Sequence, residues 1–332
     1  MSVVDRPEPS APGPGEVVVA PEAVGICGSD YHIFLGELSE DAGGTFPRIQ
    51  GHEVGAIIEA VGDGCRAQLR VGGRVALLPI HACGECYPCS VGRPNACDNF
   101  RLIGVHIDGG LQERFTIGQD QVFPIAVDDG GLAAMAEPVS IAVRAVRRAR
   151  VAAGEKVVIL GAGPIGQCAC LVARELGADV LMVDLRAERL ELAASMGAET
   201  LVWTDADAVV DAARRWSGGA GPGVAIDATG VPAAVRAMVD MLASAGRAAQ
   251  VGMSSHEVTL RIGSLTEKEL DVLGVSCCTR EDFAEAVAVV ERNPKVVAKM
   301  ISHEFTLANA PEAMAFAMSN PTEVMKVVIR GE

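Results

Sequence analysis

The glycine-rich segment 157–166, with the sequence VVILGAGPIG, constrains the fold of this chain more than any other feature. A run of apolar residues typical of a buried strand leads directly into Gly161, Gly163 and Gly166, and a helical pattern follows. In such a strand–turn–helix unit the first glycine makes the tight turn. The second lets a phosphate approach the backbone, and the third lets the helix pack on the strand. The free amides at the start of the helix can then bind a pyrophosphate.

The residues around this loop make a dinucleotide the expected ligand. Pro164 opens the helix at a position that needs no amide hydrogen, and Ile165 completes the loop. A second strand-like run ends at Asp184, where a carboxylate can accept from a ribose 2′-hydroxyl, which favours NAD over NADP. Arg186 and Arg189 follow closely and leave NADP open, and Arg189 is included in the predicted cofactor site. A similar turn that binds no ligand is the competing interpretation.

The pattern of apolar and polar residues along the chain changes near residue 141. Residues 1–126 contain short apolar runs cut by Gly and Pro, which predict a β-rich, barrel-like domain. Further on, strand-like and helix-like runs alternate, which predicts a parallel sheet covered on both faces and hence an α/β, doubly wound (Rossmann) domain. The strands expected in the first part are 17–20, 54–61, 74–78 and 114–117, and the elements expected later are 157–160, 165–176, 180–183, 187–196, 225–228, 233–243, 247–251, 271–275, 281–292 and a last strand at 324–329.

A cysteine cluster forms the clearest metal signal. Cys83, Cys86, Cys89 and Cys97 have the spacing C-x2-C-x2-C-x7-C within a lobe at 81–98. Thiolates two residues apart on a tight turn can reach one tetrahedral zinc ion, and four of them leave no position free, which indicates a structural site. An iron–sulfur cluster is the main alternative, although cluster motifs prefer other spacings.

Composition narrows the possible partners. The net charge of −15 argues against nucleic acid and anionic membranes, because phosphates attract basic surfaces. The sequence shows neither a secretory signal nor an apolar run long enough for a membrane span, so we expect a cytoplasmic protein. In that compartment its ten cysteines favour metal binding or burial over disulfides.

A second set of potential ligands is spread along the first half of the chain. Cys27 lies in the segment GICGSDYH, His52 and Glu53 follow Gly51, and Glu137 precedes Pro138. Taken singly, each residue has an ordinary structural explanation. Together they form a Cys/His/Glu set that would bind zinc and leave one position open for a substrate.

Five motifs follow one another along the chain: GICGSD at 25–30, GHE at 51–53, the four cysteines at 83–97, AEP at 136–138 and GAGPIG at 161–166. Together and in this order they resemble those of the zinc-dependent medium-chain dehydrogenase/reductase family, specifically its polyol, sugar-acid and threonine dehydrogenase branch. The resemblance covers nearly the whole chain. It implies a GroES-like catalytic domain at 1–138 and 279–332, interrupted by a Rossmann domain at 139–278. It also implies a homodimer or homotetramer that pairs through the edge strand 271–275.

The resemblance further implies the chemistry. Two zinc ions per subunit are expected, one structural and one catalytic, with Cys27 and His52 on the catalytic ion and Glu53, Glu137 and water competing for the remaining positions. A secondary alcohol would be oxidised to a ketone by hydride transfer to NAD. Ser29 and His32, with the nicotinamide ribose between them, would carry the released proton. A surface imidazole is the alternative interpretation of His32.

One departure from the family pattern bears on the substrate, and one alternative bears on the function. Ser276-Cys277 stand where sorbitol dehydrogenases have an Arg-Tyr pair, so sorbitol itself is not the expected substrate. The vicinal pair Cys277-Cys278 leaves a non-enzymatic NAD- or redox-sensing protein on the same fold as the alternative function.

Overall fold

The computed structural model describes residues 1–37 and 46–331, and the chain divides into two compact units. Residues 1–140 and 279–332 form one unit, called here the β-rich unit, and residues 141–278 form the other, called the α/β unit. The predicted boundary after residue 138 lies two residues from the observed one, and the boundary after residue 278 coincides with it. Helix α4 (Ala136–Arg148) crosses the first junction.

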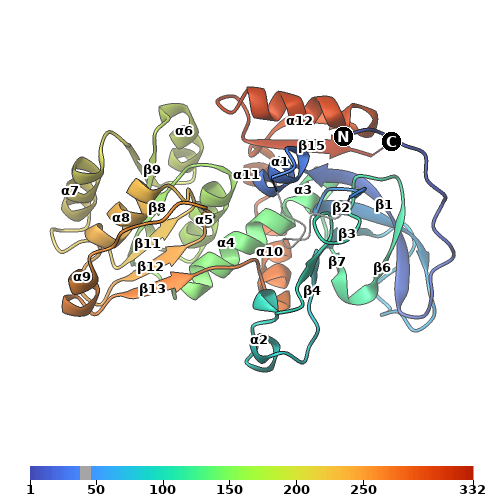
Figure 1. The fold of residues 1–332 in the computed structure, drawn as a ribbon, viewed down its shortest axis with the longest axis horizontal. Coiled ribbons are helices and arrows are strands. Elements are labelled where there is room, and N and C mark those ends of the chain that lie inside the picture. The colour runs from blue at the N-terminus through green and yellow to red at the C-terminus, as the bar shows by residue number, and fades with distance from the viewer. Residues whose placement is uncertain (38–45, 332) are drawn as a thin grey trace. The chain divides into compact units, whose positions relative to one another are not determined.

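The β-rich unit is built on a seven-stranded sheet centred on its first strand, β1 (Figure 1). The strand order is β14-β15-β1-β2-β3-β7, and β6 also pairs with β1. The strands are β1 (Glu16–Gly25), β2 (Glu53–Val61), β3 (Arg74–Leu77), β6 (Phe115–Gly118), β7 (Val122–Pro124), β14 (Ile301–Thr306) and β15 (Lys326–Arg330). The helices of this unit are α1 (Gly28–Phe34), α2 (Tyr87–Ser90), α3 (Gly130–Ala134), α10 (Arg280–Arg292), α11 (Pro294–Ala298) and α12 (Ala310–Ser319).

Two of the apolar clusters that hold the β-rich unit together pack on its sheet. One lies inside the sheet, where Val17, Val19 and Ile58 are almost fully buried. The other joins α12 to the sheet through Met314 and Val327. A small two-stranded sheet, β4 (Ile80–His81) with β5 (Arg101–Leu102), flanks the cysteine lobe. The C-terminal segment therefore completes the sheet that the N-terminal segment begins.

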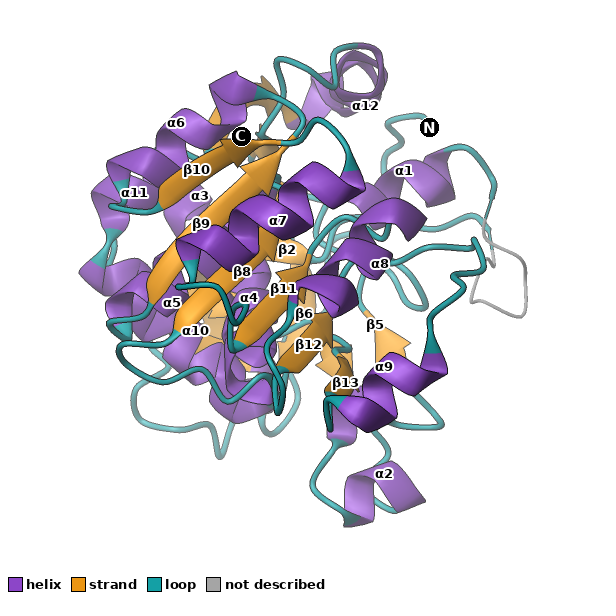
Figure 2. Cartoon of the chain, turned by 90° about the vertical axis from the view of Figure 1, so that its left-hand side faces the viewer, coloured by secondary structure: helices purple, strands orange, loops and turns teal. Residues whose placement is uncertain are grey.

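The α/β unit contains a six-stranded parallel sheet with the order β10-β9-β8-β11-β12-β13, seen strand by strand in Figure 2. Its strands are β8 (Lys156–Leu160), β9 (Asp179–Asp184), β10 (Glu199–Val202), β11 (Val224–Asp227), β12 (Arg247–Gln250) and β13 (Asp271–Gly274). Its helices are α5 (Pro164–Glu175), α6 (Ala187–Ser195), α7 (Ala206–Trp216), α8 (Pro232–Met241) and α9 (Ile262–Glu267).

The strand order reverses between β8 and β11, which makes this the switch point of a doubly wound sheet. From β8 the chain moves outward through α5 to β9, and from β11 it moves in the opposite direction through α8 to β12. Right-handed crossovers in opposite directions place their helices on opposite faces of a sheet. The predicted fold class, a β-rich domain with a doubly wound α/β domain, is confirmed.

The structure adds elements that the sequence pattern did not predict. Strand β10 and helix α7 occupy 199–216, and α12 lies in a tail that was expected to contain only short mixed runs. Strand β10 is the outer strand of its sheet and most of its residues are exposed, so it lacks the apolar run that marks a buried strand. None of the described helices combines the length and apolarity that a membrane crossing requires.

Candidate functional site

The register of β1 and β2 brings the first two motifs together. Gly25, the last residue of β1, is paired with Glu53, the first residue of β2. Cys27 follows β1 by two residues and His52 precedes β2 by one, so both side chains lie just beyond the same end of the antiparallel pair. Ligand atoms of Cys27, His52 and Glu53 lie within 4.8 Å of one another.

Gly25 is required by this approach of the two strands. A β-carbon at this position would lie 2.0 Å from Oε2 of Glu53, so any other residue would displace that carboxylate. The glycine therefore makes room for a buried acidic side chain at the site.

Helix α1 begins at this point and fixes the cysteine. Cys27 is the N-cap residue, and its backbone amide donates to Oδ2 of Asp30 over 2.9 Å in a capping box. Nε2 of Gln50 donates to the carbonyl oxygen of Asp30 over 3.0 Å, which ties the helix to the segment that leads into His52. Asp30 is only 1% exposed.

Asp30 also faces the imidazole. Its Oδ1 lies 3.8 Å from Nδ1 of His52, and neither of these buried atoms has a hydrogen-bond partner among the described protein atoms. Burial alone would lower the pKa of His52, but Asp30, the thiol of Cys27 and Glu137 together raise it well above its ordinary value. A carboxylate behind one ring nitrogen orients the ring so that the other nitrogen is available to a metal.

Glu53 is held by a lysine from the far end of the chain. Nζ of Lys326 donates to Oε1 and Oε2 of Glu53 over 2.6 and 2.8 Å, and also to the carbonyl oxygen of Ile26 over 3.1 Å. Lys326 is 3% exposed and Glu53 is 1% exposed. Burial lowers the pKa of Lys326, but the attraction of Glu53 outweighs this effect and raises it overall. The lysine therefore neutralises one carboxylate of the cluster.

Glu137 faces the same cluster from the start of α4. It is not a member of the closely spaced set of Cys27, His52 and Glu53, but its charge interacts with His52 and Lys326. Burial raises the pKa of Glu137 to about 7. A metal ion beside Glu137 would stabilise the ionised form of this buried carboxyl group and so lower its pKa.

The predicted proton-relay residues both lie on α1. Ser29 is half-buried and His32 is exposed, and their spacing of three residues places them on one side of the helix. Nδ1 of His32 lies 2.6 Å from Oε2 of Glu37. His32 is therefore a surface imidazole in an ion-pair geometry, and its predicted role in proton transfer stays a prediction.

The donor atoms of this cluster fit a zinc ion. Thiolate, imidazole and carboxylate are the usual zinc ligands, and open zinc sites use three protein ligands. A cation at this position would be contacted by the closely grouped Cys27, His52 and Glu53, and its charge would offset the burial that raises the pKa of Glu137. Cys27, His52 and one glutamate would hold it.

The cysteine lobe places its four sulfur atoms around one point. Sγ of Cys86 lies 3.4 Å from Sγ of Cys89 and 3.7 Å from that of Cys97, and Cys97 lies 3.5 Å from Cys83. Sulfur atoms about 2.3 Å from a tetrahedral zinc ion would lie about 3.8 Å apart, so the arrangement fits this metal. Backbone amides of Glu85 and Cys86 lower the pKa of Cys83 to about 6, which favours the thiolate.

The glycine loop of the α/β unit has the geometry of a phosphate site. Gly161 has φ +96°, and a β-carbon on Gly166 would lie 1.8 Å from the carbonyl oxygen of Gly161. Pro164 is the first residue of α5, as predicted, and Gly163 is its N-cap. Gly163, Pro164 and Ile165 are half-buried, so this part of the loop is accessible to a ligand.

Two side chains brace the loop against the neighbouring strand and helix. The carboxylate of Asp184 accepts from the amide of Ala162 over 2.7 Å and from that of Arg186 over 2.9 Å. Nε2 of Gln167 donates to the carbonyl oxygen of Arg189 over 2.6 Å. The guanidinium of Arg189 reaches to 3.8 Å from the position that a β-carbon on Gly163 would occupy, so it overlies the loop.

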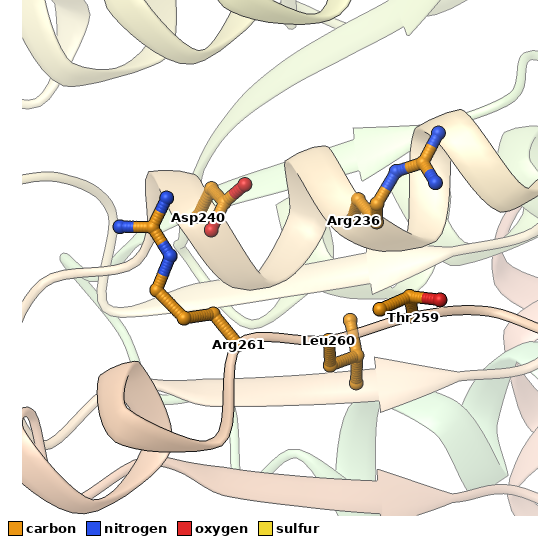
Figure 3. Close-up of a pocket in the computed structure, with 5 residues that line it drawn as sticks. All are labelled: Arg236, Asp240, Thr259, Leu260 and Arg261. Carbon is orange, nitrogen blue, oxygen red and sulfur yellow. The ribbon is translucent and has the colours of Figure 1, made fainter.

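A separate hollow of about 340 Å³ lies elsewhere on the α/β unit (Figure 3). Its lining residues come from α8 and from the segment before α9, and none of the predicted site residues is among them. They are Arg236, Asp240, Thr259, Leu260 and Arg261.

A Cys/His/Glu cluster suited to zinc and a doubly wound unit with a phosphate loop define a zinc- and dinucleotide-dependent dehydrogenase. The family model described as "Alcohol dehydrogenase GroES-like domain" matches residues 13–127, and the one described as "Zinc-binding dehydrogenase" matches residues 164–292. The chain belongs to the zinc-binding alcohol dehydrogenase family.

Similar proteins of this family act on sugar acids or bind nicotinamide cofactors. L-galactonate-5-dehydrogenase of Escherichia coli is 33% identical over 96% of this chain and 92% of its own length. An alcohol dehydrogenase of E. coli CFT073 complexed with NADH is 30% identical with a TM-score of 0.88, covering 99% of this chain and 95% of the other. A zinc-binding dehydrogenase of Sinorhizobium meliloti bound to NADP is 31% identical with a TM-score of 0.87, covering 97% and 93%.

The site contains residues to which the sequence interpretation gave no role. Asp30 belongs to the quoted segment GICGSD, and its position three residues after an N-cap could have indicated the capping box. Gln50 and Lys326 carry no such signal. Lys326 and Glu53 are separated by 273 residues, so only the folded sheet brings them together.

Proposed function

We propose that the protein oxidises a secondary alcohol flanked by further hydroxyl groups, such as a polyol or a sugar acid, to a ketone with NAD as hydride acceptor. The buried cluster of Cys27, His52 and Glu53, backed by Asp30 and Lys326, carries this proposal. The substrate class is supported by the similarity to L-galactonate-5-dehydrogenase.

Residues of the β-rich unit would have different roles in this reaction. A zinc ion at this position would act as a Lewis acid that lowers the pKa of the substrate hydroxyl. Cys27 and His52 would anchor the ion, and Asp30 would hold the imidazole in the binding orientation. Ser29, half-buried beside Cys27, and the exposed His32 would carry the hydroxyl proton from the site toward solvent.

We infer that Glu137, rather than Glu53, is the carboxylate available to the ion. Both oxygens of Glu53 already accept from Lys326, so a metal would have to compete with a buried ion pair for them. Within the described part of the chain Glu137 forms no such ion pair, and burial is the main effect that opposes its charge. Water or substrate would then take the remaining position.

A panel of secondary alcohols tests the proposed function. Sugar acids, polyols, simple diols and amino alcohols would each be incubated with the zinc-loaded protein and NAD, and NADH would be measured by absorbance. We expect turnover to be greatest with a sugar acid or polyol. A protein that reduces NAD with none of these four classes of alcohol would refute the proposal and favour the alternative function, a non-enzymatic NAD or redox sensor. Burial argues against that alternative, because Cys278 of its thiol pair is only 2% exposed.

Asp184 is expected to select NAD. Its carboxylate ends β9, where it would accept from a ribose hydroxyl and repel a 2′-phosphate. Replacing Asp184 with alanine should lower the ratio of kcat/KM for NAD to that for NADP by about tenfold or more, because both effects are lost and Arg186 and Arg189 remain. The control is Asp205→Ala, which removes an N-cap of the same unit away from the loop. An unchanged ratio in Asp184→Ala would assign the choice to another residue.

We further propose that two copies pair through β13. This strand ends the described sheet, is hydrogen-bonded to β12 on one side, and exposes Val272 to 44%. An open strand edge is a template for pairing with a second chain. Val272→Lys should reduce the mass measured by sedimentation to that of a smaller assembly, whereas Val231→Lys, an exposed apolar residue outside the edge, should not. Equal masses for wild type and Val272→Lys would contradict pairing through this strand.

The cytoplasmic location expected from the sequence stays a prediction.

A further inference from the structure

The carboxylate of Asp227 is the centre of a hydrogen-bond network that the proposed chemistry does not use. Asp227 is the last residue of β11 and is fully buried, with 0% exposure. Its Oδ1 accepts from the hydroxyl of Thr229 over 2.6 Å. Its Oδ2 accepts from the amide of Gly230 over 2.8 Å and from Nε2 of Gln250 over 2.7 Å. A carboxylate is kept in a protein interior only when such donors compensate for the lost water.

The same residue joins the ends of two strands through its backbone. The carbonyl oxygen of Asp227 accepts from the amides of Val251 and Gly252, both over 2.9 Å. Gln250, at the end of β12, donates from the same Nε2 to the carbonyl oxygen of Gly252 over 2.7 Å. Side chain and backbone of Asp227 therefore fix the two segments that follow β11 and β12.

These two segments touch one another and the glycine loop with no space for side chains. A β-carbon on Gly252 would lie 2.1 Å from the amide nitrogen of Gly230, and one on Gly230 would lie 2.2 Å from the carbonyl oxygen of Met253. A β-carbon on Gly161 would lie 2.6 Å from Cγ2 of Thr229. The carboxyl ends of β8, β11 and β12 thus form one continuous backbone surface.

The order of the strands decides which half of a dinucleotide meets this surface. Asp184 at the end of β9 places the adenosine ribose on the β9 side, and the loop after β8 places the pyrophosphate at the switch point. The other half of the molecule must then continue over β11 and β12. Thr229 and Gly252 are half-buried and Val231 and Met253 are exposed, so a ligand can reach this surface.

We propose that Asp227 is a positioning residue for the nicotinamide half of the cofactor, acting through Thr229, Gly230 and Gln250. It touches no ligand itself but sets the relative position of the two segments on which the nicotinamide and its ribose rest. The inference depends on the proposed function only in requiring that the chain bind a nicotinamide dinucleotide.

Binding of NAD and of ADP to the whole zinc-loaded protein separates this role from a general structural one. ADP carries only the half that the glycine loop and Asp184 would hold. In Asp227→Asn, an NH₂ group replaces one acceptor oxygen, so a donor faces the donors that surround this side chain and at least one hydrogen bond is lost. We expect the Kd for NAD, measured by titration calorimetry, to rise about tenfold or more, and the Kd for ADP to change less than about twofold.

A second pair of variants protects the test if Asp227→Asn folds poorly. Thr229→Val keeps the shape of the side chain and removes the hydroxyl that donates to Asp227, whereas Thr229→Ser keeps the hydroxyl. Thr229→Val should raise the Kd for NAD more than Thr229→Ser does, and the Kd for ADP should again change little. Asp205→Asn, at the N-cap of α7, is the control for loss of an aspartate from this unit.

The outcomes distinguish the inference from the proposed function. Selective loss of NAD binding in Asp227→Asn and Thr229→Val supports the inference. Equal weakening of NAD and ADP, or unchanged binding of both, overturns it and leaves the proposed dehydrogenase intact. A wild-type protein that binds ADP but not NAD would refute the proposed function and the inference together.

Discussion

Cys27→Ser should abolish the NAD-dependent oxidation of alcohols and remove one of the two expected zinc ions. The thiolate would be lost from the buried cluster with His52 and Glu53, and the hydroxyl of serine is a poor substitute as a zinc ligand. Lewis-acid activation contributes several kcal/mol, so turnover should fall by about 10³-fold or more. Serine is also a good N-cap residue, so α1 should keep its start and the chain its fold. Zinc analysis, activity and NAD binding measure the three effects, and NAD binding should stay largely intact.

Two further cysteine variants serve as a control and a comparison for Cys27→Ser. Cys65→Ser keeps a donor to the carbonyl oxygen of Glu16 in the same unit and should retain both zinc ions and activity. Cys86→Ser should also lose one zinc ion, but through the lobe at 81–98, and its main effect should be lower stability because structural zinc contributes folding energy. Unchanged turnover in Cys27→Ser would overturn the assignment of the catalytic site. A stable but inactive Cys86→Ser would point to catalysis in the lobe.

Lys326→Met should cause the largest loss of stability of any single change at the site. The substitution leaves the carboxylate of Glu53 buried without its cation, since both of its oxygens accept from Nζ of Lys326. Breaking a buried pair by removing one partner costs about 3–5 kcal/mol. The free energy of unfolding, measured by urea denaturation at a fixed zinc concentration, should fall by about that amount.

A double-mutant cycle separates the ion pair from the loss of packing. Lys326→Met combined with Glu53→Gln removes the unpaired charge, so the double variant should be more stable than Lys326→Met alone. For comparison, Arg292→Met acts on the exposed pair with Glu285 and should cost no more than about 1 kcal/mol. If the losses of the two single variants simply add, Lys326 and Glu53 do not depend on each other as the structure indicates.

Local sequence patterns predicted those parts of the site whose residues are close along the chain. The loop at 161–166 needs glycine where φ is positive or where backbones touch, and Gly161 and Gly166 meet these requirements in the structure. The four cysteines reach one point because short turns at 83–97 bring them there. In both cases the geometry follows from a few consecutive residues.

Patterns that depend on burial were harder to interpret. The strand β10 was not predicted, because an outer strand with exposed residues lacks the continuous apolar run of the inner strands. The β-rich unit was predicted by class, but its strand order, in which β15 joins β1, depends on pairing between segments some 300 residues apart.

By itself the sequence determined the fold class, the phosphate loop, the cysteine lobe and the identity of the potential ligands Cys27, His52, Glu53 and Glu137. Only the tertiary structure decided how these ligands differ from one another. The pairing of Gly25 with Glu53 brings Cys27 beside His52, and the addition of β15 places Lys326 on Glu53 but not on Glu137. The physical reason is that spacing sets local geometry, whereas the charge that each buried carboxylate faces depends on contacts between distant segments of the chain.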